Sequence, residues 1–465
     1  MRVVVVNLPD IDGLNIIKDL YNGAWCRGGR IGGVVMPPLS LLYAYASVKP
    51  FVRQIKLIDA VFKGLSVDAV ISRIKHYRSD FIIAHTSSYT LESDRLMLHI
   101  IRRALPEISI FLYGNLTGEQ ANQIVDVGAA DFVCCQDPEE VLGELFEKLS
   151  GTMSFSDKIV GLHSKYNREH ELRPLNDLDE KPIPDRKPIL KYNYPNPLAR
   201  TKKWTNMLTA RGCLFHCPFC NTPGYYQQKY RRHSLDRVIK EILYLKGLGY
   251  KEIFFRDDLF HSGRIKEFCE ALIEQKIKIL WSCNLRADTI DEDTVGLMAK
   301  SGCHTLKFGV ESGDPLTLTS LNKPSREQTI RIFNACKKNG IHTHGHFMIG
   351  LPGETYQQMK KTMEFVHELS PYTFSLGLFT PHPGSTFYDD LEQQGQLTKG
   401  VWKEAISNNP SEVDDETLKN MLRNAYMRFY LNPVRLVSYA VSGKNWKALY
   451  NAGMQFVRQF GRIRS

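Results

Sequence analysis

Three cysteines in one short segment are the residues of this chain best suited to chemistry. Cys213, Cys217 and Cys220 have a C-x3-C-x2-C spacing in the stretch Ala-Arg-Gly-Cys-Leu-Phe-His-Cys-Pro-Phe-Cys-Asn. Three thiolates on one loop suit three irons of a 4Fe-4S cube and leave the fourth iron without a protein ligand. An iron with an open position can bind a small chelating molecule and pass it an electron. The alternative is a zinc site, but zinc needs a fourth ligand at a suitable spacing, and His216 lies too close to its neighbours.

This spacing, with Phe219 directly before the last cysteine, resembles the signature of the radical S-adenosylmethionine (SAM) superfamily. The resemblance implies a partial β/α barrel in which Phe219 lies at the SAM site and the open iron binds the amino and carboxylate groups of SAM. Reductive cleavage of SAM then yields a 5'-deoxyadenosyl radical that abstracts hydrogen. The resemblance also implies a reducing partner, such as a flavodoxin or a ferredoxin.

Two apolar runs after the cysteines end in charged residues that the resemblance assigns to SAM. Asp257 and Asp258 follow the run that begins at Glu252, where the family places an acidic residue against the SAM ammonium. Capping of the next helix is the alternative for Asp258. Arg286 ends the next run and is suited to pairing with the SAM carboxylate, and its alternative is a surface arginine.

Three more short matches follow in the family's order. Gly-Val-Glu-Ser-Gly at 309–313 implies that Glu311, Ser312 and Gly313 lie at SAM, with Glu311 and Ser312 bonded to the ribose hydroxyls. Gly-Leu-Pro-Gly-Glu at 350–354 implies that the backbone at Gly350 passes the adenine. Thr-Pro-His-Pro-Gly-Ser at 380–385 resembles the family's Thr-Pro-x-Pro-Gly-Thr. Each match alone is weak, but their order after the cysteines makes the set specific.

His342, His344 and His346 alternate along one predicted strand. A strand places all three on one face, with neighbours about 7 Å apart. That spacing is too wide for one shared metal ion, so we expect them to line the lumen of the barrel, with one His touching substrate.

Residues 1–150 alternate short β-rich apolar runs with helical stretches, which predicts a parallel, doubly wound sheet. The predicted strands are Val3–Val6, Ile55–Ile58, Phe81–Ala84, Ile108–Tyr113 and Phe132–Cys135. Ligands of such sheets bind at the carboxyl ends of the strands. No Gly-x-Gly-x-x-Gly follows the first strand, which argues against a dinucleotide.

A flavodoxin-like domain ahead of this cysteine motif resembles the cobalamin-binding domain of cobalamin-dependent radical SAM enzymes. We expect cobalamin near Ser87, Ser88, Gly114 and Thr117. Asp59-Ala-Val-Phe-Lys-Gly64 lacks the His that ligates cobalt in methionine-synthase-like domains, so we expect no His ligand to cobalt. The alternative is a domain that has lost the cofactor.

The predicted fold class is α/β, in four parts. Residues 1–150 form the flavodoxin-like domain, 151–200 a proline-rich connector, 201–395 the partial (β/α)6 barrel, and 396–465 a basic helical tail.

Nine of the ten net positive charges fall in the last 49 residues, Thr417–Ser465, which contain no acidic residue. An apolar stripe at helical spacing, from Trp446 to Phe460, favours a closing helix on the barrel, and a helix lying on an anionic membrane is the alternative. No nucleic-acid-binding module accompanies the charge. The N-terminal apolar run is too short for a signal peptide, and ten cysteines without an export signal predict a cytoplasmic protein, with peripheral membrane contact as a variant.

Together these features predict an anaerobic enzyme that cleaves SAM and transfers a methyl group from methylcobalamin to an unactivated carbon of a small or lipid-like substrate. The first alternative is a rearrangement, cyclisation or oxygen insertion without methyl transfer. The second alternative is a binding protein that holds the cluster or cobalamin without catalysis.

Overall fold

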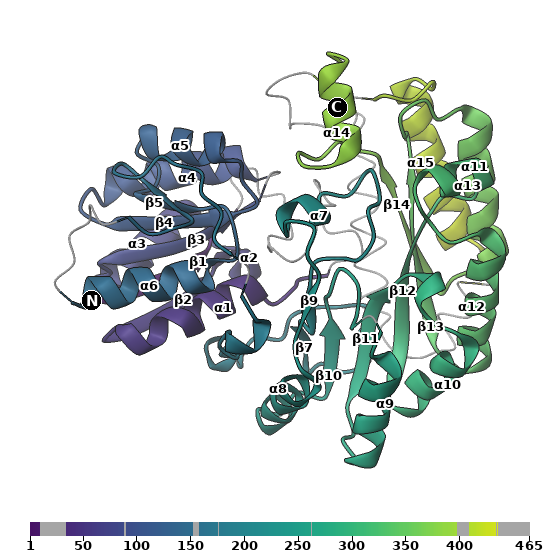
Figure 1. Cartoon of the computed structure of the whole chain (residues 1–465), viewed down its shortest axis with the longest axis horizontal. Helices are drawn as coiled ribbons and strands as arrows, with labels where there is room; N and C mark the ends of the chain where they lie inside the picture. Colours follow the sequence, from purple (N-terminus) through teal and green to yellow (C-terminus); the bar gives the residue numbers. More distant parts are fainter. Residues whose placement is uncertain are drawn as a thin grey trace. The chain divides into compact units, whose positions relative to one another are not determined.

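The chain forms two units, Met1–Asn196 and Pro197–Ser465, each built on a parallel sheet (Figure 1). The computed structural model describes residues 1–9, 34–87, 90–151, 158–174, 176–261, 263–397, 409–433 and 435. Each unit is considered separately below.

The first sheet has the strand order β2-β1-β3-β4-β5-β6. Its first five strands are parallel, and β6 pairs antiparallel with β5. The strands are β1 (Arg2–Asn7), β2 (Gln54–Asp59), β3 (Phe81–Thr86), β4 (Ser109–Gly114), β5 (Phe132–Cys134) and β6 (Leu162–Ser164). The order 2-1-3-4-5 is one of the two common doubly wound arrangements. All five strands predicted from the sequence are present.

Helices cover both faces of this sheet, because its central strands contain continuous buried apolar runs, Val3–Val6 in β1 and Phe81–Ala84 in β3. Alternate residues such as Val4 and Ile82 belong to one core with α3, α4 and α5, while Phe81 packs edge-to-face on Phe146 of α6. The helices are α1 (Leu39–Val48), α2 (Ala60–Lys63), α3 (Val67–Tyr77), α4 (Leu91–Ala104), α5 (Gly118–Asp126) and α6 (Pro138–Ser150).

The predicted connector, 151–200, instead adds regular structure to the first unit. It contributes β6 and the 3-10 turns η3 (Leu178–Glu180) and η4 (Lys187–Ile189), and the unit extends to Asn196. The Tyr194 hydroxyl donates to the buried carboxylate of Asp59 at 2.7 Å. Prolines keep the elements short without separating this segment from the sheet.

The second sheet is parallel throughout, with the order β14-β13-β12-β11-β10-β7. Its strands are β7 (Trp204–Met207), β10 (Glu252–Phe255), β11 (Leu280–Leu285), β12 (Cys303–Glu311), β13 (His342–Ile349) and β14 (Thr373–Leu378). The helices are α7 (Thr222–Tyr225), α8 (Leu235–Gly247), α9 (Ile265–Glu274), α10 (Glu292–Lys300), α11 (Pro315–Ser320), α12 (Arg326–Lys338), α13 (Tyr356–Leu369), α14 (Thr386–Gln393) and α15 (Asp415–Tyr430). Figure 1 shows α8, α9, α10, α12 and α13 along one side of this sheet.

Two tyrosines of α15 satisfy the backbone at the open edge of β14. The Tyr426 hydroxyl accepts from Leu376 N and donates to Leu376 O, at 2.9 and 3.2 Å. The Tyr430 hydroxyl does the same for Phe374, at 3.1 and 2.8 Å. Tyr426 and Tyr430, four residues apart on α15, thus match Leu376 and Phe374, two residues apart on β14. Their hydroxyls cover a strand edge that could otherwise pair with another strand.

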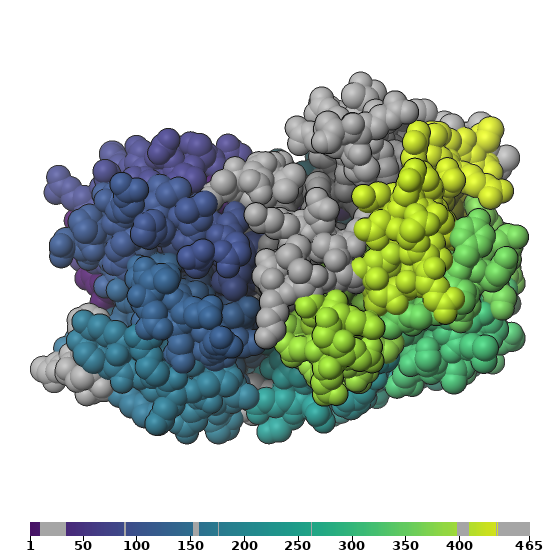
Figure 2. All heavy atoms as spheres, turned by 90° about the horizontal axis from the view of Figure 1, so that it is seen from above, coloured from purple at the N-terminus to yellow at the C-terminus, as the bar shows by residue number. Residues whose placement is uncertain are grey.

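Segment 409–433, which contains α15, lies at the molecular surface (yellow in Figure 2). The apolar stripe predicted from Trp446 to Phe460 lies outside the described residues. Within the described residues, no helix has the length and hydropathy needed to span a membrane.

Replacing Tyr426 or Tyr430 with Phe should lower the free energy of unfolding by about 1–3 kcal/mol, because each change leaves a strand amide and carbonyl without a partner. Urea unfolding followed by circular dichroism measures the loss. Tyr356→Phe is the matched control, since that side chain is 49% exposed, and it should change stability by less than about 0.5 kcal/mol. Equal effects in all three variants would refute this role of the hydroxyls.

Candidate radical SAM site

The loop that carries the cysteines is fixed at its start by a buried carboxylate. Asp257, just after β10, accepts from Thr209 N at 2.6 Å, Thr209 Oγ1 at 2.5 Å and Ala210 N at 3.0 Å. Burial raises the pKa of Asp257 to about 7, against the opposing effect of these hydrogen bonds. The carboxylate therefore joins the end of β10 to the chain that enters the cysteine loop.

Gly212, directly before the first cysteine, is required by its conformation and by its surroundings. Its φ is +88°, and a Cβ there would lie 2.2 Å from Lys229 O. Ala210 and Arg211 on one side of it form β8, which pairs with β9 (Arg231–Arg232). The loop thus leaves this ribbon at a point where only glycine fits.

The three cysteines are free thiols of intermediate exposure. Burial raises the pKa of Cys213 to about 11 and that of Cys220 to about 12, and Cys217 is close enough to add to both shifts. A bound metal is the usual means of making such thiols into thiolates. The three sulfur atoms do not all lie within 4.8 Å of one another, as the ligands of one zinc ion would. The donor set fits the wider corner spacing of an iron-sulfur cube better than a single ion.

Arg286 is buried against the cysteine loop, so the alternative of a surface arginine is wrong. Its Nε and Nη2 donate to the two carboxylate oxygens of Asp288 at 3.0 and 2.8 Å. Its Nη1 donates to Asn322 O at 2.8 Å and lies 3.6 Å from Cys217 Sγ. The guanidinium carbon is 3.6 Å from the centroid of the Phe215 ring. Arg286 therefore packs against the cysteine loop through the Phe215 ring. It also places a positive charge beside Cys217, a predicted cluster ligand.

Glu311 ends β12 with a φ of +67°, which is unusual for a residue with a side chain. Its carboxylate accepts from the Lys323 ammonium at 3.0 Å, and both side chains are buried. Lys323 also donates to Gly309 O at 3.3 Å and lies 5.3 Å from the centroid of the Phe219 ring. Lys323 was not predicted, and no sequence motif marks it.

Ser312 and Gly313 are bonded to α13, and their predicted place at SAM stays a prediction. The Ser312 hydroxyl is fully buried, lies 3.1 Å from Thr362 Oγ1 and accepts from Asp314 N. Gly313 N donates to Thr362 Oγ1 at 3.0 Å, and a Cβ at Gly313 would lie 2.4 Å from Lys361 O. These two residues pack β12 against α13.

The Gly-Leu-Pro-Gly-Glu motif forms a turn closed by its own glutamate. Glu354 Oε2 accepts from Gly350 N at 2.8 Å and Leu351 N at 3.1 Å. Its Oε1 is buried without a hydrogen-bond partner among the described residues, and burial raises the pKa of Glu354 to about 7. The φ of Gly350 is +83°, so this backbone shape favours glycine.

Phe219 anchors the cysteine loop to the carboxyl ends of the last strands. It is buried with Met348, Leu351 and Phe379, and the cluster also includes Leu321 and Leu391. Cys217 and Cys220 pack against the same cluster. The phenyl ring therefore fixes the loop through apolar packing.

Asp258 contacts the segment that carries the cysteines. Its carboxylate accepts from the Gly212 backbone and the Thr222 hydroxyl, and desolvation raises its pKa to about 7. It does not cap α9, whose N-cap is Arg264, so that alternative is wrong. Asp258 as a whole residue is exposed, whereas Asp257 is fully buried.

In the first unit, the predicted cobalamin residues lie at the carboxyl ends of β3 and β4. The Ser87 hydroxyl lies 3.0 Å from Thr90 Oγ1, and Thr117 caps α5 through Gln120. A Cβ at Gly114 would lie 2.4 Å from Thr86 O, so the two strand ends approach as closely as glycine allows. Ser88 lies outside the described residues.

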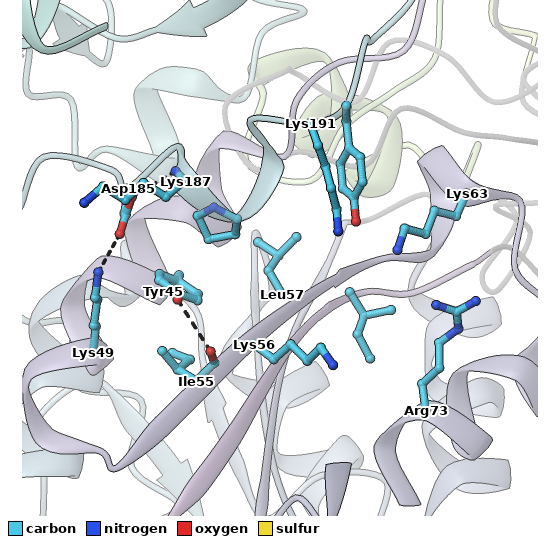
Figure 3. Close-up of a pocket in the computed structure, with 13 residues that line it drawn as sticks. Tyr45, Lys49, Ile55, Lys56, Leu57, Lys63, Arg73, Asp185, Lys187 and Lys191 are labelled. Atoms are coloured by element: carbon cyan, nitrogen blue, oxygen red, sulfur yellow. Dashed lines mark hydrogen bonds and ion pairs between the residues drawn. The ribbon is translucent and has the colours of Figure 1, made fainter. Parts of the chain in front are cut away.

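A separate cavity of about 390 Å³ lies along β2 (Figure 3). Its lining is rich in cations, among them Lys56, Lys63, Arg73 and Lys191, and Lys49 pairs with Asp185 at 2.7 Å. None of the predicted cobalamin residues lines it.

Comparison with known proteins agrees with this site. Residues 207–366 match the model of the radical SAM superfamily. The second unit therefore contains a radical SAM domain.

The chain is homologous to methyltransferases and cyclases along most of its length. It is 29% identical over 424 residues to an uncharacterized methyltransferase of Pyrococcus horikoshii, covering 88% of this chain and 91% of the relative. It is 25% identical over 391 residues to the anaerobic magnesium-protoporphyrin IX monomethyl ester cyclase of Rubrivivax gelatinosus, covering 81% and 70%.

The fold is shared with the radical SAM methyltransferase TsrM from Kitasatospora setae, which was solved with cobalamin and a [4Fe-4S] cluster bound. The TM-score is 0.66 at 16% identity, covering 86% of this chain and 79% of TsrM.

Replacing any one of Cys213, Cys217 and Cys220 with Ala should remove most of the iron and sulfide bound after anaerobic reconstitution, because a cube with two protein ligands is poorly held. Metal analysis and the optical spectrum measure this. Cys269→Ala is the matched control, since Cys269 is buried in α9, and it should lower stability only. Iron retention in the loop variants, or its equal loss in the control, would contradict the assignment.

Glu354 should make stability depend on pH. Its pKa rises from 4.5 to about 7 on folding, so the folded chain binds this proton more tightly. The resulting stabilisation is complete below about pH 4.5 and is lost as the pH rises through 7. Glu354→Gln removes the titration. The wild type should therefore lose roughly 2–3 kcal/mol relative to the variant between pH 4.5 and 7.5, measured by urea unfolding. A difference that stays constant across this range would exclude the effect.

Proposed function

We propose that this chain is a cobalamin-dependent radical SAM methyltransferase that methylates an unactivated carbon of a small molecule. The observation that carries the proposal is a triad of free cysteines at the carboxyl edge of one parallel sheet, joined in one chain to a second, doubly wound sheet. Homology to a named methyltransferase over 88% of the chain supports it.

Cys213, Cys217 and Cys220 would hold the cluster. Their spacing, their accessibility and the Arg286 guanidinium beside Cys217 fit a group with net negative charge. When bound, the cluster supplies the electron that cleaves SAM, and cobalamin supplies the methyl group. A carbon radical can take a cobalt-bound methyl group, whereas the SAM sulfonium gives its methyl group to nucleophiles.

Each residue around the loop would contact a different group of SAM. Asp258, an exposed residue beside the cysteines, would bind the ammonium group, and fully buried Asp257 would fix the start of the loop. Glu311, oriented by Lys323, would bind the ribose hydroxyls. Arg286 is occupied by Asp288, so it would act on the SAM carboxylate mainly through its charge. The backbone at Gly350 would pass the adenine.

The first unit would be a flavodoxin-like cobalamin domain, and the second sheet a partial (β/α)6 barrel. Ligands of doubly wound sheets bind at the carboxyl ends of the strands, where Ser87, Gly114 and Thr117 lie. TsrM, which shares the fold, was solved with cobalamin bound and also with a tryptophan substrate. A small-molecule substrate and a flavodoxin or ferredoxin as reductant therefore complete the proposal.

A second candidate is cyclisation, rearrangement or oxygen insertion without methyl transfer. Homology to an anaerobic cyclase over 81% of the chain favours it. The two functions differ in their use of SAM, because methylation of cobalamin produces S-adenosylhomocysteine.

Anaerobically reconstituted protein, loaded with cobalamin and reduced, should convert SAM to both 5'-deoxyadenosine and S-adenosylhomocysteine. Chromatography with mass detection quantifies both products. Cys217→Ala should abolish 5'-deoxyadenosine formation while leaving cobalamin binding, read from the optical spectrum, unchanged. 5'-Deoxyadenosine alone would favour the second candidate, and neither product would exclude both.

A further inference from the structure

One face of the second sheet carries polar side chains that no motif explains. We call it the inner face and define it by Lys307 of β12, His344 and His346 of β13, and Ser375 of β14. Side chains alternate across a strand, and the Phe308 ring next to Lys307 packs 5.1 Å from Phe333 of α12. Lys307 therefore points to the side opposite α12.

The parallel register aligns these residues in rows. Lys307 pairs with Asn284 of β11 and with His344, which pairs in turn with Thr373 of β14. In the next row towards the carboxyl edge, His346 pairs with Gly309 and Ser375. The Glu311 carboxylate and the Lys323 ammonium lie over Gly309 in the second row, 2.6 and 3.0 Å from where a Cβ would be.

The Lys307 ammonium has no carboxylate partner among the described residues. It lies 3.7 Å from the centroid of the Phe254 ring. Glu252, the acid on the same side of β10, is already bound to His304 Nε2 at 3.0 Å and Thr201 N at 2.7 Å. Burial, with the nearby Arg256 charge, lowers the pKa of Lys307 to about 7. A half-buried cation of this kind is complemented by an anion.

A chain of hydrogen bonds orients the ring of His346. His344 Nδ1 lies 2.7 Å from Thr373 Oγ1, His344 Nε2 lies 3.3 Å from Ser375 Oγ, and His346 Nδ1 lies 2.7 Å from the same hydroxyl. One order of donors runs from the Thr373 hydroxyl to His344 Nδ1, from His344 Nε2 to the Ser375 hydroxyl, and from that hydroxyl to His346 Nδ1. In this order the proton of the His346 ring lies on Nε2. That atom has no hydrogen-bond partner among the described residues, and burial lowers the pKa of His346 to about 3, so the ring is neutral.

This pair lies just below the cysteine loop. Met348, two residues beyond His346 on the same side of β13, belongs to the apolar cluster of Phe219. Two residues along a strand span about 7 Å. A molecule held at His346 would therefore reach the space beside the cysteines.

We propose that the inner face binds an anionic group of the substrate, a carboxylate or a phosphoryl group, between Lys307 Nζ and His346 Nε2. An anion there selects the hydrogen-bond order that leaves the proton on Nε2, so Thr373, His344 and Ser375 are positioning residues. The rest of the substrate extends towards the carboxyl edge, where the reacting carbon meets the radical. This inference rests on the proposed function only in taking the inner face as the substrate site.

Protection of Lys307 from acetylation tests the proposal on the full-length, reconstituted protein without reductant. Peptide mass spectrometry follows the reaction with acetic anhydride at pH 7.5, in the presence of benzoate, phenylphosphonate or benzyl alcohol. Benzoate or phenylphosphonate should slow acetylation of Lys307 at least about fivefold, because a bound anion both shields the amine and keeps it protonated. Benzyl alcohol, which has the same ring and no charge, should not. The better of the two anions identifies the acid group.

Exposed Lys251 is the internal control and should react at the same rate in every sample. His346→Asn should raise the benzoate concentration for half protection about tenfold. His342→Asn, on the same strand and face but stacked on Tyr372 at 3.8 Å, should leave it unchanged. Absence of protection, equal slowing of Lys251, or equal effects of the two His variants would each overturn the proposal.

This experiment involves no turnover, so its result is separate from that of the proposed function. Protection without SAM cleavage would support the anion site and refute the methyltransferase. Formation of both 5'-deoxyadenosine and S-adenosylhomocysteine without protection would support the methyltransferase and refute the anion site.

Discussion

The carboxylate of Asp257 is the constraint on which the site depends. It joins the end of β10 to the backbone amides of Thr209 and Ala210. The chain then turns at Gly212, directly before Cys213. Removing one partner of a buried, hydrogen-bonded charge costs more than the bond itself, because the remaining groups stay desolvated. The start of the cysteine loop is therefore fixed by the packed sheet.

From that starting point the motif residues divide into two groups. Ser312, Gly313 and Glu354 build the turns at the strand ends, through contacts with Thr362, α13 and the Gly350 amide. Asp258 and Glu311 keep polar atoms near the loop. A motif of five residues thus contains residues that shape the backbone and residues that meet the ligand, and letter patterns do not separate the two.

The sequence was sufficient to predict features that depend on residues close together along the chain. Alternating apolar runs predicted the five parallel strands of the first sheet, and the order of the short motifs after the cysteines predicted the radical SAM domain. Arg286 was predicted at the site, but its bond to Asp288 and its contact with Phe215 depend on side-chain packing. Lys307 and Lys323 were missed because their partners come from other strands or loops. The row that joins Lys307 to His344 exists only once the register of β12 and β13 is fixed.

The central claim is that one metal position in this loop is left open for SAM. The most direct test is the electron paramagnetic resonance spectrum of the reduced, reconstituted protein, recorded with and without SAM carrying a 15N-labelled amino group. The account predicts a shifted cluster signal with a resolved hyperfine coupling to the label. An unchanged signal in fully loaded protein would show that no iron is open to SAM and would contradict the account.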